Sequence, residues 1–355
     1  MVRRAGKPAE EHEVTALQES APAPDPGADP VAGAHGAAEA ARAQASAQAG
    51  ALVDALCRGV LGQRLTIEHA VTAALAGGHV LLEDQPGTGK TLLARSLATA
   101  LGASFRRVQA TPELTAEDVT GGPVFDPGTG ALRFVPGPVF AHVVLVDELN
   151  RTPARTQAAF MEAMDERAVT LDGIRHELPH PHLVVATQNP MDHAGTYPLP
   201  EGQLDRFLVA LSLGRLGPDV EADVVRARIA GTTESGLMPV VDPHGLLVLQ
   251  AHARATHVAQ NVLDYAIAIV RATRAHVGVE LGASTRAAVG LVAAAQARAL
   301  LGGRPFVAAD DVKALAPAVL GHRLVLRGRG PGGGSDAGRA LIAELLPTVA
   351  VPVGR

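Results

Sequence analysis

The sequence predicts an α/β protein in which a parallel sheet flanked by helices carries two inserted β-hairpins and is followed by an all-helical region. Between residues 79 and 213, short apolar runs alternate with segments of helical apolar spacing, which is typical of a parallel sheet. Two stretches within this region instead place short strand patterns on either side of turn residues, as hairpins do. After Gly214, only helical spacing continues.

Five apolar runs are the predicted strands of the sheet, at residues 79–83, 104–108, 143–146, 183–186 and 207–213. Two predicted helices, 51–62 and 67–75, precede the first strand. The hairpins are predicted at 124–134 and 168–178, and Asp172-Gly173 supplies the positive φ angles of a tight turn in the second. The predicted helices of the last region are 219–229, 243–255, 261–276, 284–301 and 308–320.

Composition divides the chain into four parts. Residues 1–47 are rich in Ala and Pro and have almost no large apolar side chains, so burial cannot offset ordering entropy and a disordered tail is expected. Residues 48–214 form the predicted sheet domain, and residues 215–326 form the predicted helical lid domain. The Gly-rich end, 327–355, is expected to be flexible, although its short apolar run could dock.

The composition favours a cytoplasmic protein. The 355 residues include one cysteine, so no intramolecular disulfide can form, which fits a reducing compartment. No hydrophobic signal segment follows the first residues, and no run of about 18 uncharged apolar residues predicts a membrane span. A formal net charge of −5, without a Lys/Arg cluster, disfavours nucleic acid as a partner.

Residues 84–92 have the pattern of a phosphate-binding loop between a strand and a helix. Backbone N–H groups of such a Gly-rich turn, with the N-terminus of the following helix, bind an anion. Lys90 adds a mobile charge for the β- and γ-phosphates, and the Thr91 hydroxyl would bind Mg²⁺. The predicted nucleotide-binding residues are Gln85, Pro86, Gly87, Thr88, Gly89, Lys90, Thr91 and Leu92. The consensus has Gly where this chain has Asp84, which leaves the entry geometry of the loop open.

A second motif completes a nucleotide-hydrolysing site. The apolar run 143–146 ends in Asp147 and Glu148, as a Walker B element requires. At the end of the strand, Asp147 can hold Mg²⁺, and Glu148 can polarise an attacking water. The two motifs together predict ATP and Mg²⁺ as cofactors and ATP hydrolysis as the reaction.

Three further residues are candidates by position. Asn189 follows the fourth strand and would emerge beside the Walker B strand, where it could orient the water, although Asn-Pro is also a common turn. Arg206 enters the fifth strand, and Arg286 lies at the start of a helix. Isolated arginines are usually solvated surface groups, so the residues alone leave these two roles open.

These motifs resemble those of MoxR-type AAA+ ATPases over about residues 52–326. The matching segments are the phosphate loop, the Walker B run 145–151, the helix 156–167 and the motifs at 186–190, 195–200, 204–207, 282–287 and 321–323. The two hairpins would then be the helix-2 insert and the pre-sensor-1 hairpin. In this family, the loop position occupied here by Asp84 varies.

The resemblance also implies roles for the isolated polar residues. Asn189 would be sensor 1 and Arg286 sensor 2. Arg206 would be the arginine finger offered to a neighbouring subunit, with Arg151 and Arg167 as rival candidates. These roles imply a homo-oligomer, expected to be a hexameric ring.

The resemblance implies a chaperone that matures metal-dependent enzymes or other complexes together with von Willebrand factor A domain proteins. A nucleic-acid motor or loader on the same fold would need a basic stripe along the hairpins, yet residues 123–138 hold one Arg and one Asp. A nucleotide-gated scaffold with negligible turnover is suggested only by Asp84. The hairpins are candidate client contacts, or else protective flaps.

Residues His176 to His180 spell the zinc-protease pattern H-E-x-x-H. That motif requires both histidines one helical turn apart. Pro179 removes a helical hydrogen bond, and Asp172-Gly173 just upstream predicts a hairpin strand here. The sequence therefore argues against a zinc site.

Overall fold

The computed structural model describes residues 30–189, 196–231, 236–328 and 335–352. The chain divides into two units, residues 1–40 and 41–355. Helix α1 (Pro30–Gly59) begins in the first unit, and every later element belongs to the second. The expected disorder is therefore wrong for residues 30–47, which are helical. Their alanine-rich sequence has high helix propensity, which an argument based on side-chain burial does not count. Residues 1–29 of the expected tail lie outside the described residues.

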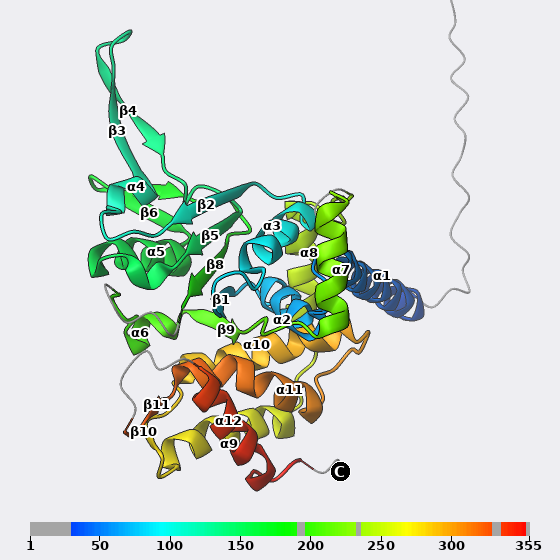
Figure 1. Ribbon diagram of the computed structural model, residues 1–355. Coiled ribbons are helices and arrows are strands. Elements are labelled where there is room, and N and C mark those ends of the chain that lie inside the picture. The colour runs from blue at the N-terminus through cyan, green and yellow to red at the C-terminus, as the bar shows by residue number, and fades with distance from the viewer. Residues whose placement is uncertain (1–29, 190–195, 232–235, 329–334, 353–355) are drawn as a thin grey trace, which may run out of the picture. The chain divides into compact units, whose positions relative to one another are not determined.

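The sheet of the second unit has five strands, as predicted. They are β1 (His79–Glu83), β2 (Phe105–Gln109), β5 (Val143–Asp147), β8 (Leu183–Gln188) and β9 (Phe207–Leu211). Their order is β2-β5-β8-β1-β9, and all four pairings are parallel (Figure 1). The carboxyl ends of the strands therefore meet at one edge of the sheet, where the phosphate loop and the Walker B residues lie.

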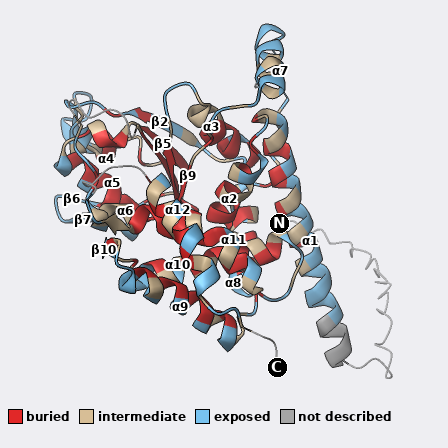
Figure 2. Cartoon of the chain, turned by 60° about the horizontal axis from the view of Figure 1, so that its bottom comes forward, coloured by how far each residue is buried: buried red, intermediate tan, exposed pale blue. Residues whose placement is uncertain are grey.

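Both faces of the sheet are covered, which explains why its central strands read as continuous apolar runs. On β1, Leu81 belongs to a cluster that contains Phe160 of helix α5 (Ala154–Glu166), whereas its neighbours Val80 and Leu82 belong to the other cluster. That second cluster includes residues of α1, α2 (Arg64–Leu75) and α3 (Lys90–Ala100). Figure 2 shows the buried strands between these helices.

Both predicted hairpins are present. Strands β3 (Gly121–Asp126) and β4 (Ala131–Pro136) follow the short helix α4 (Ala116–Thr120) and project away from the sheet (Figure 1). Strands β6 (Ala168–Leu171) and β7 (Ile174–Glu177) form the second hairpin. Its turn has φ angles of 49° at Asp172 and 77° at Gly173, which confirms the predicted Asp-Gly turn.

The region after β9 is mostly helical, as predicted. Its main helices are α7 (Pro218–Ile229), α8 (Pro243–Arg254), α9 (Gln260–Ala275), α10 (Thr285–Leu301) and α11 (Ala309–Leu320). The shorter elements of this region include the 3₁₀ turns η2 (Gly321–Arg323) and η3 (Leu346–Thr348). Before β9 lie the 3₁₀ turn η1 (Leu149–Arg151) and α6 (Glu201–Leu204). Within the described part of the chain, no helix combines the length and hydropathy that crossing a membrane requires.

Two features of this region differ from the prediction. Strands β10 (Val279–Leu281) and β11 (Val325–Leu326) form a small antiparallel sheet in the region expected to be all-helical, because strands this short carry no alternation signal. The end expected to be flexible contains helix α12 (Asp336–Leu345), which buries Ile342 and Leu345. The apolar run docks because these side chains find an apolar surface, a tertiary fact that composition cannot show.

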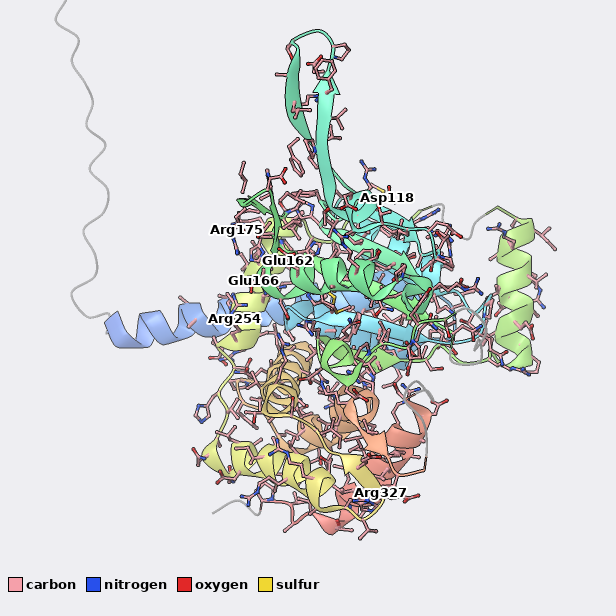
Figure 3. The ribbon with its side chains drawn as sticks, turned by 90° about the vertical axis from the view of Figure 1, so that its left-hand side faces the viewer. Asp118, Glu162, Glu166, Arg175, Arg254 and Arg327 are labelled. Carbon is pink, nitrogen blue, oxygen red and sulfur yellow. The ribbon has the colours of Figure 1, made fainter. Side chains whose placement is uncertain are left out.

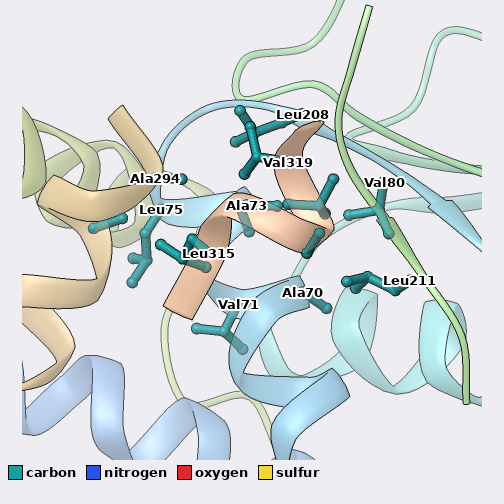
Figure 4. Packing of buried hydrophobic residues seen from close by; sticks show 14 of the residues in the cluster. Ala70, Val71, Ala73, Leu75, Val80, Leu208, Leu211, Ala294, Leu315 and Val319 are labelled. Carbon is teal, nitrogen blue, oxygen red and sulfur yellow. The ribbon is translucent and has the colours of Figure 1, made fainter. Parts of the chain in front are cut away.

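The lid helices and the sheet share one apolar core. Figure 4 shows Leu315 and Val319 of α11 close to Ala73 of α2 and to Leu208 of β9. These residues belong to one continuous buried cluster. The sheet and the lid are thus packed together through α2 and are not separated by a polar interface.

Two buried histidines predict acid sensitivity. Burial lowers the pKa of His79 to about 3 and that of His182 to about 4, and their rings are 6.2 Å apart. The unfolded chain binds a proton at each histidine near pH 6.5, whereas the folded chain binds it only near pH 3 to 4. The contribution of the neutral histidines to the free energy of unfolding is therefore fully present above pH 6.5 and is lost as the pH falls toward 4. Between pH 7 and pH 5, each histidine should cost about 2 kcal/mol of unfolding free energy.

The measurement is the urea midpoint at pH 7 and at pH 5. The variant His182→Gln should weaken the dependence on pH, and His244→Gln, at an exposed position, serves as the control. A midpoint that does not change with pH would contradict the prediction.

Candidate functional site

The phosphate loop follows β1 and has open space beside its glycines. Gly87 and Gly89 have φ angles of 88° and 97°, which favour glycine, and an added Cβ on either would meet nothing within 4 Å. Gly89 is the N-cap of α3. The Lys90 ammonium donates to the carbonyl oxygens of Asp84 at 2.6 Å and Gln85 at 2.9 Å. Space, helix N-terminus and ammonium together fit a polyphosphate.

The loop and the Walker B residues lie close enough to interact electrostatically. Partial burial lowers the pKa of Lys90, while the negative charges of Asp84, Asp147 and Glu148 oppose this shift. Three acidic groups therefore act on one ammonium, at the carboxyl edge of the sheet. The structure brings the two predicted motifs together.

Asp84 binds the segment that leaves the sheet. Its carboxylate accepts hydrogen bonds from the Ser212 hydroxyl at 2.9 Å and from the backbone N–H groups of Leu213 at 2.5 Å and Gly214 at 3.3 Å. Where the consensus has glycine, this chain thus has a side chain that attaches the loop entry to the connection between β9 and α7. Asp84 in place of the consensus glycine is therefore explained by these hydrogen bonds, and its side chain does not fill the space where phosphate would bind.

Both acidic Walker B residues are paired with arginines. Asp147 accepts a hydrogen bond from Arg107 Nε at 2.6 Å, and Glu148 forms an ion pair with Arg151 Nε at 2.9 Å. The Thr187 hydroxyl accepts from the Glu148 backbone N–H at 2.9 Å and lies 3.4 Å from an Asp147 carboxylate oxygen. Glu148 has a φ of 59°, a left-handed conformation that costs a non-glycine residue of order 1 kcal/mol or more and that recurs at active sites.

The strand that ends at Gln188 lies between the two motifs. Strand β8 pairs with β1 on one side and with β5 on the other. Asn189, the next residue, thus follows the strand beside Asp147 and Glu148, as the sequence predicted. Its role as sensor 1 stays a prediction.

Arg206 and Arg286 lie together at the opposite edge of the sheet. Both bind one carboxylate: Arg206 Nε lies 2.6 Å and Arg286 Nη2 lies 2.5 Å from oxygens of Asp165. Arg206 precedes Phe207, which pairs with His79 at the start of β1, whereas the phosphate loop follows the end of β1. Five strand residues span about 13–16 Å, so both arginines are separated from the phosphate loop of their own chain.

The motif 321–323 attaches the lid to this edge. Arg323 donates to Asp205 Oδ1 at 2.7 Å, and Asp205 Oδ2 accepts from the Ser284 hydroxyl at 2.8 Å. Ser284 is the N-cap of α10, and Arg286 is the second residue of that helix. The motif therefore positions the helix that carries Arg286.

The rival finger candidates differ in position. Arg151 is paired with Glu148 of its own chain, at the Walker B edge. Arg167 Nη1 lies 3.4 Å from His180 Nε2.

The H-E-x-x-H pattern does not form a zinc-protease helix. His176 belongs to strand β7, and its ring stacks on Phe134 with the ring centroids 4.1 Å apart. The two histidines of the pattern therefore do not share a helical turn.

Sequence reasoning missed Arg107, Thr187 and Asp165. A signal existed for Arg107, because two arginines interrupt the strand pattern 105–109. Thr187 directly precedes the Gln188-Asn189 pair and resembles any strand threonine. Asp165 gives no signal, since it stands among other acidic residues of α5 and its partners lie 41 and 121 residues away.

Comparisons with known proteins agree with this geometry. Residues 79–209 match the family model "ATPase family associated with various cellular activities (AAA)", and residues 271–344 match the AAA lid domain. The chain is 42% identical to the uncharacterized protein YeaC of Bacillus subtilis over 85% of this chain and 94% of that protein. It is 37% identical to the chaperone MoxR1 of Mycobacterium tuberculosis over 76% of this chain and 73% of that one.

A third relative and a solved structure extend the match. Protein MoxR of Paracoccus denitrificans is 33% identical over 75% of this chain and 85% of that protein. The crystal structure of a proposed ATPase from Cytophaga hutchinsonii superposes with a TM-score of 0.82 at 32% identity, covering 90% of this chain and 99% of that chain. The chain therefore belongs to the MoxR family of AAA+ ATPases.

Proposed function

We propose that this protein is an ATP-hydrolysing chaperone that remodels or matures client protein complexes. The observation that carries the proposal is that the loop with Lys90 follows β1 while Asp147 ends β5 and Glu148 follows it, on the two sides of β8, so that all three lie at the carboxyl edge of the sheet. The name of the related chaperone MoxR1 supports the chaperone part.

Different residues of the site would bind ATP and catalyse its hydrolysis. The loop 85–92 and Lys90 would bind the phosphates of ATP, and Thr91 with Asp147 would hold Mg²⁺, which neutralises phosphate charge when bound. Glu148 would accept a proton from the attacking water, after its ion pair with Arg151 loosens, and Asn189 would orient that water. Lys90 and Asp147 thus serve binding, whereas Glu148 and Asn189 serve turnover.

The test of hydrolysis is steady-state release of phosphate from ATP by the purified protein with Mg²⁺. Turnover above that of a Lys90→Ala preparation supports the proposal. Tight nucleotide binding without such turnover would instead favour the nucleotide-gated scaffold.

We further propose that the site is completed by a second copy of the chain in a ring, expected to be hexameric. Arg206 and Arg286 share the single carboxylate of Asp165, so the group retains a surplus positive charge. The separation of these arginines from their own phosphate loop supports their presentation to the nucleotide of a neighbouring subunit.

The hairpins are the proposed contacts with a von Willebrand factor A domain partner and its client. Phe125 and Leu132 face each other across the β3–β4 hairpin and are 60% and 68% exposed. At its base, Phe134 stacks on His176 of the second hairpin. That hairpin is attached to α5, since Arg175 lies beside Glu166 and donates to its carbonyl at 2.9 Å (Figure 3). An exposed apolar tip on an attached base suits binding of a protein.

Replacing Phe125 and Leu132 with serine should leave basal ATPase activity within about twofold but reduce partner binding at least about tenfold, because two apolar anchors are lost. The measurement is binding of the partner protein that the Glu148→Gln variant recovers from lysate, together with phosphate release from ATP. The matched control is Arg133→Ser, an exposed residue of the same hairpin that pairs with Val124. Equal loss in both variants would contradict an apolar contact.

A Glu148→Gln variant should hold ATP and therefore its client, which makes it the protein for recovering partners from native lysate. Recovery of a protein with a von Willebrand factor A domain supports the proposal. Recovery of nucleic acid without such a protein would favour the nucleic-acid motor or loader.

A further inference from the structure

Glu83 is a buried acid that the hydrolysis scheme does not use. It is the last residue of β1, directly before the phosphate loop, and its side chain is 4% exposed. Gln188, at the end of β8, donates from Nε2 to Glu83 Oε1 at 2.6 Å. The backbone N–H of Ser335 donates to Glu83 Oε2 at 3.1 Å. One carboxylate thus joins the ends of two central strands to the C-terminal helix region.

Arg339 of α12 supplies the positive charge that this buried acid needs. Its Nη1 lies 3.6 Å from Glu83 Oε2 and donates to the carbonyl of Ala210 in β9 at 3.1 Å. Its Nη2 also pairs with Asp336, which is 91% exposed. A buried carboxylate without a partner is strongly disfavoured, so the charge of Glu83 and the position of Arg339 depend on each other.

The helix that carries Arg339 is held against the body by close backbone contact. A Cβ on Gly338 would lie 2.0 Å from the carbonyl oxygen of Gly321 in η2, so no side chain fits between them. Ile342 and Leu345 of the same helix are buried in the shared apolar core. Helix α12 is therefore a packed element, and its Arg339 side chain reaches the carboxyl ends of β1 and β9.

We propose that α12 is a positioning element of the ATPase site, acting through Arg339 and Glu83 on the Gln188–Asn189 end of β8. This inference rests on the proposed hydrolysis. Glu83 fixes the side-chain amide of Gln188, and Asn189 is the next residue in the chain. With Arg339 in place, Glu83 holds the end of β8 so that Asn189 keeps the position that turnover requires.

The test compares three variants. Arg339→Met removes the charge but keeps an apolar chain of similar reach, so Glu83 is left unpaired. Glu83→Gln removes the need for a partner charge. Its single amide oxygen can accept from the Ser335 N–H, and its NH2 group can donate to the Gln188 side-chain oxygen once the Gln188 amide is turned over. Asp336→Ala removes only the exposed ion pair of Arg339 and is the matched control.

We expect Arg339→Met to lower kcat for ATP at least about tenfold with KM within about twofold. Addition of Glu83→Gln to this variant should restore kcat to within about threefold of the wild type, because a neutral amide needs no counter-charge. A merely structural loss of α12 docking would not be rescued in this way. Asp336→Ala should keep wild-type kcat.

Hydrogen exchange of residues 183–188 gives a readout that needs no ATP. Exchange should increase in Arg339→Met and return toward the wild type in the double variant, and this holds even if the protein does not hydrolyse ATP. If Arg339→Met does not fold, the double variant alone decides: a folded protein with near-wild-type exchange and kcat supports the proposal, and a tenfold lower kcat overturns it. Wild-type kcat and exchange in a folded Arg339→Met variant would also overturn it.

Discussion

Replacing Lys90 with alanine is expected to weaken ATP binding at least about 100-fold. The ammonium lies at the open loop, and the loss of its charge-assisted hydrogen bonds to phosphate costs about 3 kcal/mol. Turnover should disappear with binding. Titration with a fluorescent ATP analogue measures the affinity, and an affinity of Lys90→Ala within about tenfold of the wild type would contradict the assignment.

Unlike Lys90→Ala, Glu148→Gln should keep near-wild-type ATP affinity while its turnover falls by about 10²- to 10⁴-fold. The amide keeps the size of the side chain but cannot accept the proton of the attacking water. Glu113→Gln, at an exposed position outside the site, is the matched control and should hydrolyse ATP normally. Wild-type-like turnover by Glu148→Gln would direct attention to Asn189 or to another carboxylate.

Arg206→Ala is expected to retain ATP affinity and to lose about 10³-fold or more in kcat, the usual contribution of an arginine finger. When this variant is mixed with Lys90→Ala, part of the activity should return. In a random one-to-one ring, about a quarter of the sites would join an ATP-binding subunit to a neighbour with an intact finger. Phosphate release across mixing ratios measures this recovery.

Arg286→Ala should behave in the same way, because Arg286 binds the same carboxylate, Asp165, as Arg206. Recovery of Arg206→Ala but not of Arg286→Ala would assign Arg286 to the nucleotide of its own subunit. Failure of both mixtures, with co-assembly shown, would favour Arg167 as the finger, or Arg151 once it is released from Glu148.

The sheet and the phosphate loop could be predicted because their signals are local. A strand covered on both faces is apolar throughout, so the runs around Val144 and Val185 are recognisable without knowing their neighbours. Gly87 and Gly89 occupy backbone conformations that favour glycine, so the loop is visible in consecutive residues. The Asp172-Gly173 turn follows the same rule.

The tails show where such reasoning fails. Composition predicted a disordered N-terminal tail and a flexible Gly-rich end whose short apolar run could dock. Residues 30–47 are nevertheless helical, and the apolar run forms the docked helix α12. Alanine-rich segments form helices by propensity, and a ten-residue helix becomes stable when Ile342 and Leu345 find a surface. Neither effect is contained in hydropathy averaged along the chain.

The sequence by itself determined the nucleotide loop, the Walker B pair and the alternation that builds the sheet, because each depends on residues adjacent in the chain. Only the tertiary structure decided which partner each charged side chain has: Asp84 binds Ser212, Arg286 binds Asp165, and Glu83 binds Arg339. Asp165 binds Arg286, which is 121 residues away, and Glu83 binds Ser335, which is 252 residues away. Such pairs are selected by the packing of helices on the sheet, and burial then makes each unpaired alternative costly.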